Sequence, residues 1–146
     1  MSQDIIETTN DLSPLDPPSV PFWIEVYEGL GKTEGLIRFK YPNLILEFST
    51  RDDVIGFFKS DVKEVTLPLA SVAEIELKSN AFRTKLVLRA NTLKSLEGMP
   101  GSKQGMAELR VKRKHKDAAA SLVSSVSLRL SELRLQQLDN ELNRPD

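Results

Sequence analysis

The chain has no cysteine and a single histidine among its 146 residues, and these two absences exclude several kinds of chemistry. Without cysteine there is no disulfide framework, no thiolate nucleophile and no cysteine-based metal site. A serine–histidine–aspartate triad would have to use His115, which lies in a lysine-rich run. We therefore expect no catalytic site, no metal and no cofactor.

Long apolar runs and an excess of one charge are also missing. No apolar run approaches the roughly 20 residues of a membrane span, and the N-terminus lacks the pattern of a secretory signal. Twenty Lys and Arg residues balance 21 Asp and Glu residues, so the formal net charge is -1. This balance excludes the strong overall basicity of a dedicated nucleic-acid coat. We expect a cytoplasmic protein with one domain.

Residues 1–21 differ in composition from the rest of the chain. They contain four acidic residues, no lysine or arginine, and four prolines near their end. This composition is typical of a flexible acidic arm. We therefore place the single folded domain at residues 22–142.

From Phe22 to Arg113, apolar residues recur at every second position, which indicates strands with one buried face. Pro42-Asn43 predicts a tight turn, Ser79-Asn80 breaks the alternation, and glycine-rich residues 92–105 predict a long loop. The inward positions are Phe22, Ile24, Val26, Ile37, Phe39, Tyr41, Leu44, Leu46, Phe48, Val65, Leu67, Ala73, Ile75, Leu77, Leu86, Leu88, Ala107, Leu109 and Val111. The pattern predicts about seven antiparallel strands.

At Asp117 the period changes to the spacing of an amphipathic helix, which we place at residues 117–140 with Asp117 as its N-cap. Its apolar stripe consists of Ala119, Leu122, Val123, Val126, Leu130 and Leu133. Grouped strands followed by one helix exclude doubly wound parallel folds. We expect a mainly β domain, a barrel or sandwich of seven strands, capped by this C-terminal α-helix.

This order of elements resembles the pleckstrin-homology (PH-like) superfold, in which a bent antiparallel sheet forms a partly open barrel capped by a helix. Two local features are similar to its bacterial members: Leu67-Pro68-Leu69 before the strand at 72–78, and the basic strand end 110–114 before an alanine-rich helix. The resemblance implies a binding or scaffolding module that has no chemistry of its own. Members engage phosphoinositides, peptides or other domains, and the fold does not choose among these.

Phosphoinositide-binding members of that superfold carry a basic motif in the first hairpin. Here Lys32 is expected in the loop between the first two strands, with Arg38 and Lys40 on the polar face of the second strand. The motif's final arginine is replaced by Lys40, which loses the bidentate contact to phosphate. The three residues are candidates for binding anionic lipid, and the alternative is a solvated strand face.

A second basic segment lies at the last strand and the start of the helix. It comprises Arg110, Lys112, Arg113, Lys114 and Lys116. This basic edge is suited to an anionic lipid or an acidic protein segment, or it only discourages strand addition. Phe82 is the only aromatic residue nearby, so there is no stacking platform for nucleic acid.

The predicted seven strands and capping helix leave two apolar features of the sequence without a packing partner. Phe57 and Phe58 follow a charged turn and are either core residues or exposed anchors. A second leucine stripe on the helix consists of Leu128, Leu135, Leu138 and Leu142. It suits a homodimer, another domain's groove or longer wrapping around the same barrel. The sequence thus favours a protein-interaction or scaffolding module, and the alternative is a peripheral binder of anionic lipid headgroups.

Overall fold

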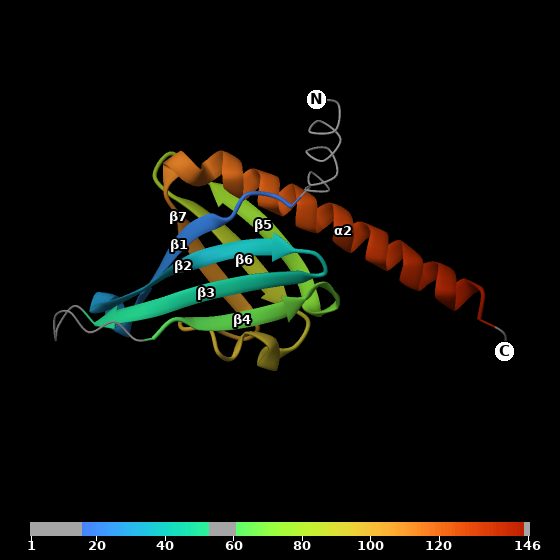
Figure 1. Ribbon diagram of the computed structural model, residues 1–146, viewed down its shortest axis with the longest axis horizontal. Helices are drawn as coiled ribbons and strands as arrows, with labels where there is room; N and C mark the ends of the chain where they lie inside the picture. Colours follow the sequence, from blue (N-terminus) through green and yellow to red (C-terminus); the bar gives the residue numbers. More distant parts are fainter. Residues whose placement is uncertain (1–15, 53–60, 145–146) are drawn as a thin grey trace, which may run out of the picture.

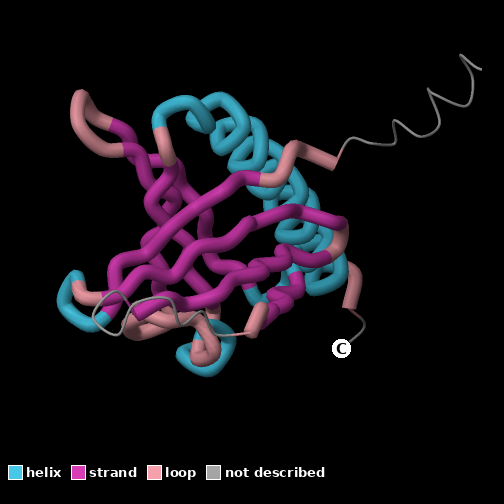
Figure 2. Tube along the Cα trace, turned by 60° about the vertical axis from the view of Figure 1, so that its left-hand side comes forward, coloured by secondary structure: helices cyan, strands magenta, loops and turns pink. Residues whose placement is uncertain are grey.

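A computed structural model describes residues 16–52 and 61–144. These residues form seven strands, four short 3-10 helices and one long α-helix. Figure 1 and Figure 2 show how these elements are arranged in space. The strands are β1 (Val20–Val26), β2 (Gly31–Lys40), β3 (Asn43–Asp52), β4 (Lys63–Pro68), β5 (Val72–Ser79), β6 (Thr84–Ala90) and β7 (Met106–Val111). The helices are η1 (Tyr27–Gly29), η2 (Leu69–Ser71), η3 (Leu93–Leu96), η4 (Arg113–His115) and α2 (Lys116–Leu142).

All seven strands belong to one antiparallel sheet with the order β4-β3-β2-β1-β7-β6-β5. The sheet bends so that β5, β6 and β7 lie behind β1 to β4 in Figure 1. At the bend, β1 and β7 pair only through Trp23 and Arg110. The predicted class, mainly β with seven antiparallel strands and one C-terminal helix, is confirmed. The sheet does not close, so it is a barrel only in a loose sense.

The core consists mainly of alternate side chains from the strands, as the sequence predicts, but a bulge between Val72 and Glu74 places Val72 in the core instead of the predicted Ala73. Ile37, Leu46 and Leu109 are completely buried, and Phe22 is 3% exposed. Because the alternation is strict in β2 and β3, one face of each strand meets the core, while the other carries mainly charged and polar residues together with Leu36 and Ile45.

Gly35 is required where β2 and β3 approach each other closely. A Cβ at this position would lie 2.0 Å from the carbonyl oxygen of Glu47 and 2.9 Å from the Cα of Phe48. Any larger residue would displace the β3 backbone, so the pairing of β2 with β3 depends on this glycine.

Tyr41 departs from the predicted alternation. It was expected to face inward with Ile37 and Phe39, but its side chain is 56% exposed. Tyr41 follows the last residue of β2, so the period of the strand no longer applies to it. Its ring instead lies edge-on to Phe39 and 4.6 Å from the Cζ of Arg129 on α2.

The C-terminal helix begins earlier than predicted. α2 starts at Lys116 with His115 at the N-cap, so the prediction of Asp117 as the N-cap is wrong. The short helix η4 directly precedes α2, which moves the helix start toward the N-terminus. Asp117 lies in the first turn instead, where its charge still interacts favourably with the helix dipole.

The predicted apolar stripe of α2 covers the sheet. Ala119, Leu122 and Val126 are completely buried, and Leu130 is 5% exposed. α2 packs mainly against β5 and η2, and the guanidinium of Arg134 donates a 2.5 Å hydrogen bond to the carbonyl oxygen of Ala73. Beyond this point α2 continues past the sheet, as Figure 1 shows.

The long segment between β6 and β7 is more ordered than a simple loop. It contains η3, and it buries Leu96 and Met99 in the core. Ser102 Oγ donates a 2.8 Å hydrogen bond to the carbonyl oxygen of Leu96, which folds the segment back on itself. The segment therefore contributes apolar packing that strand alternation alone does not predict.

Two predictions fall mainly or entirely outside the described residues. Phe57 and Phe58 lie within 53–60, so the choice between core and exposed anchor stays a prediction. Of the predicted arm, residues 1–15 also lie outside, and residues 16–19 have no regular secondary structure. β1 begins at Val20, two residues before the expected start of the domain.

Candidate functional site

The basic residues of the first hairpin do not form one cluster. Lys32 was expected in a loop, but β2 begins at Gly31, and Lys32 pairs with Glu25 of β1. Arg38 lies six residues further along the same strand, a distance of roughly 20 Å. Its guanidinium is 2.6 Å from a carboxylate oxygen of Glu47. Lys40 is exposed at the far end of β2, so no single headgroup can contact all three side chains.

Lys32 instead belongs to a group of cations around Trp23. Its Nζ lies 5.4 Å from the centre of the Trp23 ring, and the Cζ of Arg110 lies 5.8 Å from it. Trp23 sits on the outer face of β1, where β1 meets β7. The indole therefore connects the first hairpin to the predicted basic edge through cation–π contacts.

A small recess lies beside this tryptophan. It has a volume of about 240 Å³, and its lining includes Lys32, Lys112, Lys114 and His115. One carboxylate, Glu34, also lines it and is 3.5 Å from the Nζ of Lys32. The recess therefore carries net positive charge, and it brings together residues of two separately predicted basic motifs.

The five residues of the basic edge divide into two groups. Arg110 forms an ion pair at 3.1 Å with Glu25, and Arg113 donates to the carbonyl oxygen of Ala81. Lys112, Lys114 and Lys116 are exposed, and none of them forms an ion pair with a residue that the structure describes. The three lysines are the part of the edge whose charge faces solvent.

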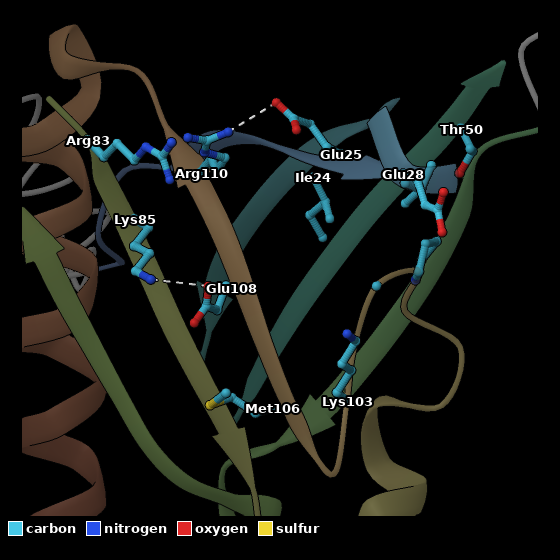
Figure 3. Close-up of a pocket in the computed structure, with 13 residues that line it drawn as sticks. Ile24, Glu25, Glu28, Thr50, Arg83, Lys85, Lys103, Met106, Glu108 and Arg110 are labelled. Atoms are coloured by element: carbon cyan, nitrogen blue, oxygen red, sulfur yellow. Dashed lines mark hydrogen bonds and ion pairs between the residues drawn. The ribbon is translucent and has the colours of Figure 1, made fainter. Parts of the chain in front are cut away.

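A larger recess opens where β1 and β7 separate beyond Trp23 and Arg110, as Figure 3 shows. Its volume is about 930 Å³, and Ile24 and Met106 contribute apolar surface to it. Lys85 pairs with Glu108 at 3.1 Å on its wall, near the pair formed by Arg110 and Glu25. These two ion pairs engage two of its carboxylates, and the charge of its lining is mixed.

The second leucine stripe of α2 is exposed along its whole length. The exposed fractions of Leu128, Leu135, Leu138 and Leu142 are 61%, 62%, 54% and 81%. These residues lie on the side of the helix opposite the buried stripe, because the two sets differ by about half a turn. After Leu133, no described residue of α2 is buried.

Comparison of the chain with models of known protein families, with curated proteins and with solved structures finds no match. No helix among the described residues has the length and apolarity needed to cross a membrane. Within residues 16–52 and 61–144, no three His, Asp or Glu side chains group as they would around a metal ion. The functional argument therefore depends on the surfaces of this chain.

Two residues that matter for these surfaces were not singled out from the sequence. Trp23 lies between the inward positions Phe22 and Ile24, and the strand register places it beside cations of β2 and β7. Phe82 was noted only as a neighbour of the basic segment, and the break at Ser79-Asn80 already indicated that it lies in a turn. A large apolar residue at the tip of a hairpin has no strand to pack against. The sequence therefore already indicated that Phe82 is exposed.

Proposed function

We propose that this protein is a non-enzymatic protein-interaction or scaffolding module with a PH-like fold. The strand order, the bend between β1 and β7, and a helix that follows the last strand support the resemblance to that superfold. The pairing of Glu25 and Glu108 with cations supports a structural use of the carboxylates in the larger recess.

The observation that carries this proposal is the exposed leucine stripe of α2. Leu128, Leu135 and Leu142 repeat every seven residues, and Leu138 follows Leu135 by three. This is the spacing with which one helix packs against another. Because the buried stripe already faces the sheet, the leucines are available to a partner without any rearrangement of the domain.

The partner that we propose is the same helix of a second copy of this chain. In the heptad set by the leucines, Arg134 and Asp139 occupy the two positions that pair between parallel helices. In antiparallel helices, Glu132 and Asp139 would face each other and repel. Arg134 already donates to the Ala73 carbonyl oxygen, and its guanidinium retains further donors. The charges therefore favour a parallel pair.

This self-association is expected to be weak. Fully burying a leucine stabilises by about 1.5–3 kcal/mol, whereas association costs about 4–15 kcal/mol in lost freedom of motion. Four leucines per chain exceed that cost by only a small margin. The expected dissociation constant lies at about micromolar or weaker.

Sedimentation velocity over a range of protein concentrations tests the proposal. The full chain is expected to shift from monomer to dimer, and the double variant Leu135→Ser, Leu138→Ser to stay monomeric. Gln136→Ser with Asn140→Ser is the matched control, because both residues are exposed on α2 outside the stripe. A full chain that stays monomeric up to about 1 mM would contradict self-association.

Binding of a lipid headgroup by Lys32, Arg38 and Lys40 together is not favoured as a second function. The three side chains are spread along β2, and Arg38 is already paired with Glu47. The recess beside Trp23 instead combines Lys32 with the exposed Lys112 and Lys114, which come from a different part of the sequence.

A further inference from the structure

Phe82 is the most exposed large apolar side chain among the described residues, with 93% of its surface in contact with solvent. It lies in the turn between β5 and β6. Phenylalanine is normally among the residues that a small domain buries. This ring therefore gains almost nothing from burial in the fold, and it is accessible to a partner outside the domain.

The turn that presents Phe82 is held in place by hydrogen bonds. Asn80 Oδ1 accepts from the backbone N–H of Phe82 at 2.8 Å and from that of Arg83 at 2.9 Å. The backbone N–H of Asn80 donates to the carbonyl oxygen of Arg83 at 2.9 Å, and Ser79 Oγ lies 2.9 Å from Thr84 Oγ1. The ring is thus presented on a preorganised turn, so binding through it requires little further ordering.

Cations surround this turn from two sides. Arg113 Nη2 donates to the carbonyl oxygen of Ala81 at 2.5 Å, which joins the β7–α2 junction to the turn. The exposed cations of the turn and the junction are Lys78, Arg83, Lys112, Arg113, Lys114 and Lys116. None of the six forms an ion pair with a residue in 16–52 or 61–144. Their combined positive charge therefore attracts an anionic surface that approaches Phe82.

We propose that Phe82 and these six cations, the basic turn, form a docking surface for an anionic membrane. An isolated apolar ring among lysines and arginines matches the boundary between charged headgroups and acyl chains. Nucleic acid fits less well, because the turn offers one aromatic ring and no row of stacking side chains. A protein partner would have to supply a pocket for Phe82, and it needs no such concentration of one charge.

The basic turn is separate from the leucine stripe. Phe82 lies near the start of α2 through the contact of Arg113 with Ala81, whereas the stripe extends toward the other end of the helix. Figure 1 shows that α2 begins where β7 ends and runs away from that point. A chain docked through Phe82 therefore keeps Leu135, Leu138 and Leu142 accessible to a second copy.

Vesicle flotation with the full chain tests this inference. The probes are vesicles of phosphatidylcholine alone and vesicles in which about a third of the lipid is phosphatidylserine. Wild type is expected to float with the anionic vesicles and not with the neutral ones. Phe82→Ser is expected to weaken binding about tenfold, and Lys112→Ser with Lys114→Ser by at least about tenfold.

Matched controls carry the same chemical changes elsewhere on the surface. Leu93→Ser removes an apolar side chain that is 67% exposed, and Lys63→Ser with Lys94→Ser removes two exposed cations. Both controls are expected to bind within about twofold of wild type. Equal losses in these controls, or no binding of wild type to anionic vesicles at low salt, would overturn the proposal.

A fluorescence measurement separates insertion of the ring from simple charge attraction. Phe82→Trp in a Trp23→Phe background places the only indole on the turn. Its emission is expected to shift to the blue with anionic vesicles and to be quenched by lipids brominated on their acyl chains. Binding without either change, or binding that Phe82→Ser leaves intact, would show that the charge is generic and that Phe82 is not an anchor.

Discussion

α2 carries two apolar stripes of similar composition, and the fold buries only one of them. The side chains of Leu122 and Leu130 are 0% and 5% exposed, whereas those of Leu128 and Leu135 are 61% and 62% exposed. Both stripes follow helical spacing, so hydrophobic pattern alone does not distinguish them. The difference lies in what is opposite each stripe: the bent sheet for the first, and solvent for the second.

α2 is longer than its contact with the sheet requires. The 27 residues of α2 span about 40 Å, and the buried residues end at Leu130. Leu133 and Arg134 still contact the sheet, and the turns after them remain helical and carry three more exposed leucines. A helix that needed only to cap the sheet could end about two turns earlier, after Arg134. The extension therefore supports the proposed pairing of this helix with a second copy of the chain.

The largest expected effect contrasts one leucine from each stripe. Leu122→Ala removes a completely buried side chain and should lower the free energy of unfolding by about 2–5 kcal/mol. Leu128→Ala should change it by no more than about 0.5 kcal/mol, because the residue is exposed in the isolated chain. Urea denaturation at a low protein concentration, where the chain is monomeric, measures both values.

Two results would contradict the contrast between the stripes. A large loss of stability for Leu128→Ala at low concentration would mean that this face packs against the same chain. A small loss for Leu122→Ala would mean that the helix contributes little to the core. Ser124→Ala serves as a control for helix propensity, because Ser124 is exposed on α2.

Hydrogen exchange tests the same contrast along the backbone. Amides of residues 119–130 should exchange only through global unfolding, whereas those of residues 136–142 should exchange at least about a hundredfold faster. Raising the protein concentration should slow exchange in the second segment, because self-association would cover it. Concentration-independent exchange at residues 136–142 would argue against a helix partner at this end.

Periodicity predicts the elements of this fold well because the sheet has one buried face. Phe22, Leu46 and Leu109 occupy the inward positions that alternation assigns to them. The period carries no information where a strand has ended, and Tyr41 is exposed for that reason. It likewise misses Leu96 and Met99, since an irregular segment buries side chains without a repeat.

The candidate surfaces were harder to predict, because they depend on which strands become neighbours. Lys32 and Lys112 are 80 positions apart in the sequence, and only the pairing of β1 with both β2 and β7 brings them to one recess. Lys32 and Arg38 are close in sequence, but an extended strand separates them. The resemblance to phosphoinositide-binding members suggested one basic motif, and the extended strand separates its residues.

Exchanging the charges of Arg134 and Asp139 tests whether the paired helices are parallel, and it has the smallest expected effect of these experiments. Asp139→Arg should weaken dimerisation by about 0.5–1 kcal/mol, since it would place two cations opposite each other in a parallel pair. Adding Arg134→Glu should restore it, whereas Arg134→Glu alone should weaken it. Sedimentation equilibrium gives the three dissociation constants at low salt, where screening is smallest. If the double variant associates no better than either single variant, parallel pairing through Arg134 and Asp139 is wrong, even if the leucines still drive association.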